Sequence, residues 1–136
     1  MISQKIIWIA LCSSISLELT WDYFERKKTG KVNHLRGFII RSLIAIAIYW
    51  HAKWYVLIYI GGYIAFFNPL INTVWFLGGW KRKGEKWIDC IKYIGRTSWI
   101  DQIWRKLFGK KTESIVLPLT FIIGIGMILL SKLLIQ

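Results

Sequence analysis

The sequence contains few acidic residues, few histidines and only two cysteines. Seven Asp and Glu stand against nineteen Lys and Arg in 136 residues, and the two histidines, His34 and His51, are far apart. Cys12 and Cys90 occur in no CxxC or histidine-rich setting, so no metal site and no cofactor are expected. Cys12 lies in an apolar stretch and Cys90 in a basic block of the chain, so we do not expect a disulfide between them. We expect both cysteines to pack as small apolar side chains.

The motifs of conventional enzymes are also missing. The chain has no Ser/His/Asp set, no HExxH, no glycine loop that cradles phosphate and no dinucleotide fingerprint. No Pro- or Ser-rich linker divides it, and no internal repeat is visible. We therefore expect one domain, residues 1–136, that is not an enzyme.

Apolar and aromatic side chains are present in excess. Hydrophobic residues make up 55% of the chain, nine residues are Trp, and the mean hydropathy is +0.44. A membrane-spanning helix needs about 20 mostly apolar residues. The first apolar stretch has no signal-peptide cleavage site after it, so we expect it to stay as a span. The pattern predicts an all-α, multipass integral membrane protein with four transmembrane helices, at about 6–23, 37–52, 54–79 and 115–135.

The basic residues fall in two blocks, 26–41 and 81–111, between the apolar stretches. This arrangement is typical of cytoplasmic loops that follow the positive-inside rule, and it argues against nucleic acid as a partner. With the N-terminus outside, sixteen Lys and Arg fall on the cytoplasmic side, against three outside: Lys5, Lys53 and Lys132. We therefore expect both termini to be extracytoplasmic.

Between the third and fourth spans, the cytoplasmic segment 84–109 has apolar residues at helical spacing. It predicts two short amphipathic helices, the first ended by Gly95 and the second begun by Ser98, with Asp101 three residues on, and ended by Gly109. Two locations are open: the bilayer surface, with basic side chains near anionic lipid headgroups, or the ends of the protein's own spans. The apolar residues expected at the interface are Trp87, Ile91, Ile94, Ile103, Trp104 and Leu107.

Polar side chains within spans are costly unless they are paired, which makes them the candidates for a functional site. Glu18 and Asp22 lie one helical turn apart near the cytoplasmic end of the first span, and Arg41 is expected at a similar depth. One interpretation is an ion pair between Glu18 and Arg41. A second is a pair of carboxylates that binds a cation or relays protons, and a third is snorkelling of each side chain to the interface.

Asn68 and Asn72 form a second polar position, on the third span. Pro69 lies between them, removes one helix donor and leaves the carbonyl of Ala65 without its helical partner, so the span should kink there. The two amides are expected to serve freed backbone groups or to bond a neighbouring helix. Alternatively, they line a polar notch together with the two carboxylates of the first span.

The fourth span carries small residues at the spacing of a helix contact. Thr120 and Gly124 are four residues apart, and Ser131 lies on nearly the same face. This pattern indicates close packing, either within the chain or in a homo-oligomer.

Two short motifs carry a resemblance to known proteins. Residues 67–72, Phe-Asn-Pro-Leu-Ile-Asn, close a span, and residues 93–101, Tyr-Ile-Gly-Arg-Thr-Ser-Trp-Ile-Asp, follow in the cytoplasmic segment. Over residues 60–105 the chain resembles a loose group of small, uncharacterised multipass membrane proteins of Bacteroidota and their phages. That group often has Asp at the position of Asn68, so a carboxylate role there does not carry over. The resemblance implies a bacterial or phage origin and no particular activity.

We expect a structural or accessory role in the membrane, exerted through a homo-oligomer or a membrane partner protein. A holin-like or other pore-forming protein is the first alternative, because small basic multipass proteins of phages are often lysis factors. A small ion or proton conductor that uses Glu18 and Asp22 is the second.

Overall fold

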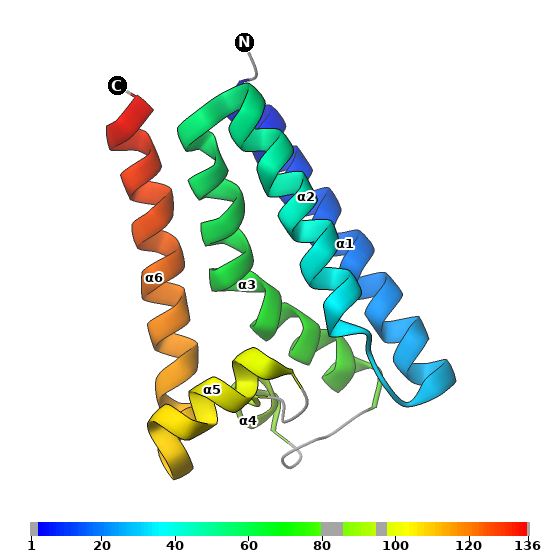
Figure 1. Ribbon diagram of the computed structural model, residues 1–136. Coiled ribbons are helices and arrows are strands. Elements are labelled where there is room, and N and C mark those ends of the chain that lie inside the picture. The colour runs from blue at the N-terminus through cyan, green and yellow to red at the C-terminus, as the bar shows by residue number, and fades with distance from the viewer. Residues whose placement is uncertain (1–2, 80–85, 95–97, 136) are drawn as a thin grey trace.

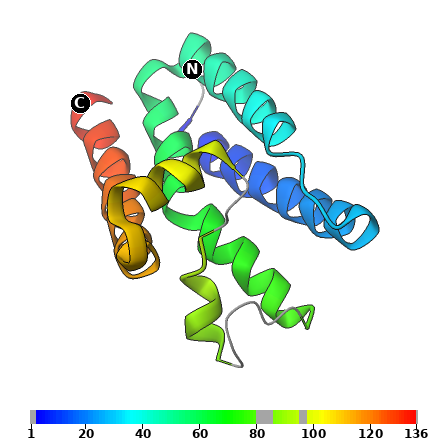
Figure 2. The same cartoon turned by 60° about the horizontal axis from the view of Figure 1, so that its bottom comes forward.

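The computed structural model describes residues 3–79, 86–94 and 98–135, and these ranges are helical apart from short connections. The expectation of an all-α protein is confirmed for this part of the chain. The elements in chain order, with η for a short 3-10 helix, are α1 (Gln4–Thr29), α2 (His34–Ala52), η1 (Lys53–Tyr55), α3 (Val56–Leu77), α4 (Trp87–Ile91), α5 (Trp99–Phe108), η2 (Gly109–Lys111) and α6 (Thr112–Ile135). In Figures 1 and 2, α3 stands between the α1–α2 pair and α6, and Figure 1 shows both chain ends at one end of the bundle.

The connection between α1 and α2 is short and capped on both sides. α1 ends at Gly30, whose φ of 73° is the left-handed conformation that glycine adopts readily, and its N–H binds the Arg26 carbonyl at 2.8 Å. α2 begins after Asn33, whose side chain accepts a hydrogen bond from the Arg36 N–H at 3.0 Å. The tight connection brings the charged end of α1 beside the start of α2.

α2 and α3 form an antiparallel hairpin, as the length of the apolar stretch predicts (Figure 1). The chain turns at η1, where Lys53 adopts a positive φ of 43°. α3 changes direction partway along its length in Figure 1, and Pro69 lies inside it. The Thr73 hydroxyl donates a hydrogen bond to the Pro69 carbonyl at 2.8 Å. The bend agrees with the kink predicted from the proline, which removes a helix donor.

α3 and α6 approach closely where two glycines face each other. A Cβ atom added to Gly61 would lie 2.5 Å from the carbonyl oxygen of Gly124, and one added to Gly124 would lie 2.7 Å from the Cβ of Ala65. Ser131 is fully buried further along α6, whereas Thr120 is only half-buried. The small residues predicted to mark a helix contact therefore make that contact within the chain, at Gly124 and Ser131.

Two helical stretches of the described residues are long and apolar enough to cross a membrane, by length and composition. They are His34–Leu77, which contains the α2–α3 hairpin, and Trp99–Ile135, which contains α6. α1 is not one of them. Two of the predicted spans therefore share the first stretch, and the fourth falls in the second.

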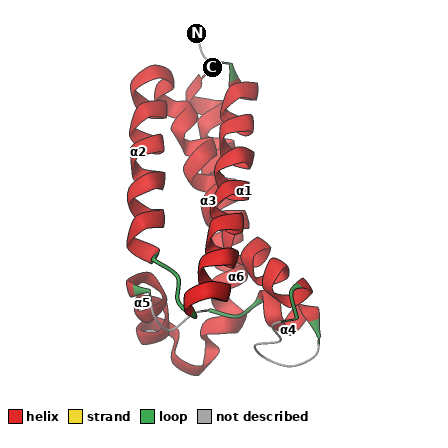
Figure 3. Cartoon of the chain, turned by 90° about the vertical axis from the view of Figure 1, so that its right-hand side faces the viewer, coloured by secondary structure: helices red, strands yellow, loops and turns green. Residues whose placement is uncertain are grey.

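α4 and α5 lie at the end of the bundle opposite the chain ends (Figure 3). α5 begins after Ser98, whose Oγ accepts the Asp101 N–H at 3.2 Å, and it ends at Gly109, so both predicted boundaries of this helix are confirmed. α4 covers only five residues. Gly95, predicted to end the first amphipathic helix, and the start of the segment at residues 84–85 lie outside the described residues.

Candidate functional site

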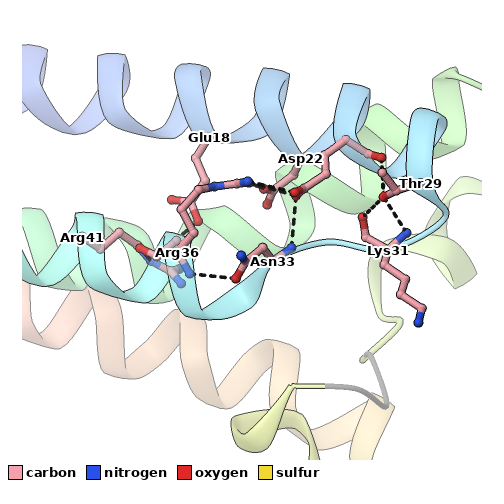
Figure 4. A network of polar contacts seen from close by, with 9 residues as sticks. Glu18, Asp22, Thr29, Lys31, Asn33, Arg36 and Arg41 are labelled. Carbon is pink, nitrogen blue, oxygen red and sulfur yellow. Dashed lines mark hydrogen bonds and ion pairs between the residues drawn. The ribbon is translucent and has the colours of Figure 1, made fainter.

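Arg36, at the start of α2, holds two carboxylates of α1. Its two terminal nitrogens each lie 2.9 Å from an oxygen of Glu25, and Nη2 also lies 3.3 Å from Asp22 Oδ1. The Asn33 N–H donates to Glu25 Oε2 at 3.1 Å, and the guanidinium carbon lies 4.8 Å from the centre of the Trp21 ring. Figure 4 shows this network joining the end of α1 to the start of α2. A two-pronged arginine–carboxylate contact fixes geometry as well as charge.

The charge state of this network follows from its contacts. The Arg36 hydrogen bonds and the backbone N–H of Asn33 hold the pKa of Glu25 below its ordinary value of 4.5. The same hydrogen bond from Arg36 to Glu25 raises the pKa of the guanidinium above its ordinary value. Both groups are therefore ionised at neutral pH, and the network acts as a charged clamp between α1 and α2.

Glu18 and Arg41 form the ion pair that the sequence suggests, with Arg41 Nε 3.7 Å from Glu18 Oε1. Nε also donates to the Gly37 carbonyl at 3.1 Å. The carboxylate packs directly on Gly37, where an added Cβ would lie 2.5 Å from Oε1. The guanidinium lies over two rings of α3, 5.4 Å from the centre of Tyr63 and 5.3 Å from that of Phe67. α1, α2 and α3 thus meet at this pair.

The two acidic residues of the predicted cluster are separately paired. Asp22 contacts Arg36, one and a half helical turns before Arg41, and Glu18 contacts Arg41. Sequence reasoning counted Arg36 and Glu25 only as loop charges and missed their role. The available signal was the short loop between two capped helices, because residues on either side of such a loop must lie close together.

Asn72 bonds the end of α4, as the expected contact with a neighbouring helix requires, so it does not line the alternative polar notch with the two carboxylates. The Asn72 amide donates to the carbonyls of Ile91, at 3.2 Å, and Tyr93, at 2.9 Å. Asn68 is half-buried. Figure 3 shows α4, whose end Asn72 holds, on the opposite side of the bundle from α2. Asn72 serves a structural role: it anchors the end of α4.

The expected interfacial residues divide between the two short helices. Ile91 and Ile94 are buried within the protein, with 9% and 2% of their surface exposed, so the prediction that they lie at the bilayer is wrong. Asn72 holds the carbonyls of Ile91 and Tyr93 against α3, and Trp87, although exposed, donates from Nε1 to the Thr73 hydroxyl at 2.9 Å. Of the two expected locations, the bilayer surface and the protein's own helices, α4 therefore takes the second.

α5 keeps an uncovered apolar face. Ile103 and Leu107 are exposed, and Trp104 is half-buried with its ring stacked on Phe108 at 5.9 Å. The opposite face is attached to the protein, because Arg105 donates to the Ile94 carbonyl and lies 3.4 Å from Glu113. This face of α5 stays a candidate for the interfacial role.

The remaining chemistry of the described residues is limited. Cys12 is exposed and Cys90 is buried, and no disulfide joins them. Within residues 3–79, 86–94 and 98–135, no three His, Cys, Asp or Glu side chains gather to hold a metal ion. In comparisons with known proteins, no family model, no curated protein and no solved structure matches the chain.

Proposed function

We propose that the chain is an integral membrane protein with four spans, α1, α2, α3 and α6, that serves a structural or accessory role without catalysis. The observation that carries this proposal is the apolar outer surface of the bundle. On α2, Leu43 and Ile46 are 61% and 62% exposed, and on α6, Ile122 and Leu133 are 67% and 70% exposed. α2 and α6 lie on opposite sides of α3 (Figure 1). In a bilayer, lipid hydrocarbon covers such a surface on all sides. A soluble protein, in contrast, rarely exposes large apolar patches to water.

α1 fits this account although it is the most polar of the four helices. Its 26 residues measure about 39 Å along the helix axis, more than the roughly 30 Å of a bilayer core. Two of its acidic residues, Glu18 and Asp22, lie toward α2 and are paired with Arg41 and Arg36. Pairing lowers the free-energy cost of placing charged side chains near the hydrocarbon, so α1 can cross the membrane beside α2 and α3.

The charge at the two ends of the bundle supports an orientation with both termini extracytoplasmic. The end that holds α4, α5 and the α1–α2 connection carries exposed lysines at residues 27, 28, 31, 86, 92, 106, 110 and 111. The positive-inside rule places such an end in the cytoplasm. There the exposed face of α5 can enter the headgroup layer, with Lys106 and its neighbours near anionic lipid headgroups.

The pairing of the charges favours an accessory role over a pore. A pore needs polar side chains along a water-filled path, either through the bundle or between copies of it. Glu18, Asp22, Arg36 and Arg41 contact one another at the meeting of α1 and α2, while the exposed faces of α2 and α6 are apolar. These apolar faces suit lipid, a second copy or a membrane partner.

Expression in bacteria separates the two roles. For an accessory protein, we expect cells to keep growing and to exclude a membrane-impermeant DNA dye, and we expect the protein to sediment with membranes after alkaline washing. Growth arrest with dye entry would reject the accessory role in favour of a pore. Release of the protein by alkaline washing would reject membrane integration itself.

A further inference from the structure

α1 and α3 run side by side in the same direction (Figure 1) and approach closely at two places. Nearer the chain ends, the Leu11 side chain occupies the space that a Cβ on Gly62 would need. At the opposite end of α3, a Cβ added to Gly78 would lie 2.9 Å from Cε2 and 3.0 Å from the hydroxyl of Tyr23. Pro69, where α3 bends, lies between these two contacts along the helix.

The two helices leave a groove of about 350 Å³ along this stretch, which we call the α1–α3 groove. It is lined by Ser16, Leu19, Thr20, Tyr23 and Phe24 of α1 and by Val74 of α3. The Thr20 hydroxyl donates to the Ser16 carbonyl at 2.8 Å, so its hydrogen bond is made within α1. The lining is therefore mainly apolar and aromatic, as in sites that hold an apolar ligand.

The width of the α1–α3 groove suits one hydrocarbon chain. From Ser16 to Phe24 the helix rises about 12 Å, so a volume of about 350 Å³ gives a mean cross-section of about 29 Å². A helix with its side chains is about 10–12 Å wide, which is a cross-section of roughly 80–110 Å². Packed carbon atoms lie about 4 Å apart, so a single acyl chain needs only roughly 20 Å². The groove can therefore take an acyl chain and is too narrow to take a helix.

The length of the groove fits one leaflet of the bilayer. In the proposed topology, the charged residues 25–28 at the end of α1 lie at the cytoplasmic surface. The rise from Ser16 to Lys27 is about 17 Å, close to half of a hydrocarbon core of about 30 Å. An acyl chain of the cytoplasmic leaflet that lies in the groove would bring its headgroup to Lys27.

Lys27 stands at the mouth of the groove. It is exposed, and it lies four positions after Tyr23 and seven after Thr20, which places it on the same face of α1. On the neighbouring face, the Arg26 guanidinium carbon lies 4.8 Å from the centre of the Trp75 ring of α3. Basic side chains from the last turn of α1 therefore frame the cytoplasmic end of the groove.

The charge at this mouth is positive. Residues 23–31 contain four basic residues and one acidic residue, Glu25. The Glu25 carboxylate is held by Arg36 of α2 at 2.9 Å, so its charge is balanced there. The basic residues of the segment therefore complement a negatively charged headgroup better than a zwitterionic one.

We propose that the α1–α3 groove binds an anionic phospholipid of the cytoplasmic leaflet, with one acyl chain between Thr20 and Val74 and the phosphate at Lys27. The proposal rests on the proposed membrane integration and adds a lipid partner to the accessory role. The apolar lining holds the chain, and the basic mouth selects the headgroup. A lipid bound in this way fills the space that α3 leaves beside α1 and joins the two helices.

Lipid retention by the purified full-length protein tests the site. The protein in mild detergent is titrated with phosphatidylglycerol and with phosphatidylcholine of the same acyl chains, and bound lipid is counted by native mass spectrometry. The wild type should retain one phosphatidylglycerol with an affinity about fivefold or more above that for phosphatidylcholine. Thr20→Trp should lower the affinity for phosphatidylglycerol about tenfold or more, because the indole fills the groove. Lys27→Gln should lower the preference for phosphatidylglycerol about fivefold and leave the affinity for phosphatidylcholine unchanged.

Each variant has a matched control on α1. Leu17→Trp adds the same ring at a position that is 72% exposed and outside the lining of the groove. Lys28→Gln removes the same charge one position further along, which is turned by about 100° around the helix. Both controls should bind the two lipids as the wild type does. If Thr20→Trp does not yield folded protein, Ser16→Trp decides by the same criterion.

Three results would overturn the lipid site. They are equal affinity of the wild type for the two lipids, undiminished affinity for phosphatidylglycerol in the deciding variant, and a wild-type dimer without bound lipid that this variant abolishes, which would assign the groove to a second copy. Membrane integration is judged separately by alkaline washing. A protein that stays with membranes but fails the lipid test loses only this site, whereas release by alkaline washing rejects the integration on which the site rests.

Discussion

Replacing Gly124 with Ala should weaken the contact between α6 and α3. The added Cβ would lie 2.7 Å from the Cβ of Ala65 and 2.8 Å from its backbone nitrogen. These atoms belong to packed helices, so the helices must move apart. Overpacking of this kind costs about 1–3 kcal/mol. Alanine is also the better helix former, by about 1 kcal/mol in a helix interior, and this gain offsets part of the loss.

Gly126→Ala is the matched control for that helix preference. Gly126 lies two residues further along α6, and a Cβ added there meets nothing within 4 Å. The gain in helix preference is common to both variants, so the difference between their free energies of unfolding should be about 1–3 kcal/mol, with Gly124→Ala the less stable. Thermal unfolding of the purified protein in one detergent gives this comparison. Equal stability of the two variants would refute the close approach of α3 and α6.

Three further predictions concern the polar contacts. Arg41→Met should lower the free energy of unfolding by about 1–3 kcal/mol because Glu18 loses its partner, and adding Glu18→Gln should restore part of it; a double variant as unstable as the sum of the singles would reject the pairing. The pKa of Glu25 is lowered in the fold, so its contribution to stability is present above its ordinary value of 4.5 and is lost as the pH falls through the folded value. Melting curves of Glu25→Gln should therefore show less destabilisation by acid than those of the wild type, and identical acid sensitivity would contradict the clamp. Asn72→Ala should release α4 and speed maleimide labelling of Cys90 in a Cys12→Ser background, whereas an unchanged labelling rate would reject the anchoring role.

Sequence periodicity predicted the helices well, because long apolar stretches and caps are local signals. Ser98, Gly109 and the turn at Lys53 stand where the sequence places element boundaries. The kink in α3 was equally accessible, since Pro69 disrupts a helix by its own chemistry. The first helix was predicted too short, because its charged end after residue 23 was taken for a loop.

The side chains that meet across helices were harder to predict. The ion pair between Glu18 and Arg41 was among the interpretations of the sequence because both residues are expected at a similar depth in the membrane. Arg36 was missed because its role depends on how closely the α1–α2 connection folds back. Asn72 makes the expected bond to a neighbouring helix, but its partner, the end of α4, could not be named from the sequence because it depends on how α3 bends. Rotation and bending of whole helices decide such contacts, and a pattern within one helix does not contain them.

The two short helices α4 and α5 show the same limit. Their apolar spacing is alike in sequence, yet α4 buries Ile91 in the protein while α5 leaves Leu107 exposed. Amphipathic spacing indicates that a face will be covered and leaves open whether lipid or protein covers it. Here the hydrogen bonds from Asn72 hold α4 against the protein.

The location of the C-terminus tests the proposed membrane topology most directly. One reporter that is active only in the periplasm and one that is active only in the cytoplasm are fused in turn after Gln136 of the full-length chain. The four-span arrangement, with its lysine-rich end in the cytoplasm, predicts activity of the periplasmic reporter alone. Activity of the cytoplasmic reporter at this position would contradict the proposed topology.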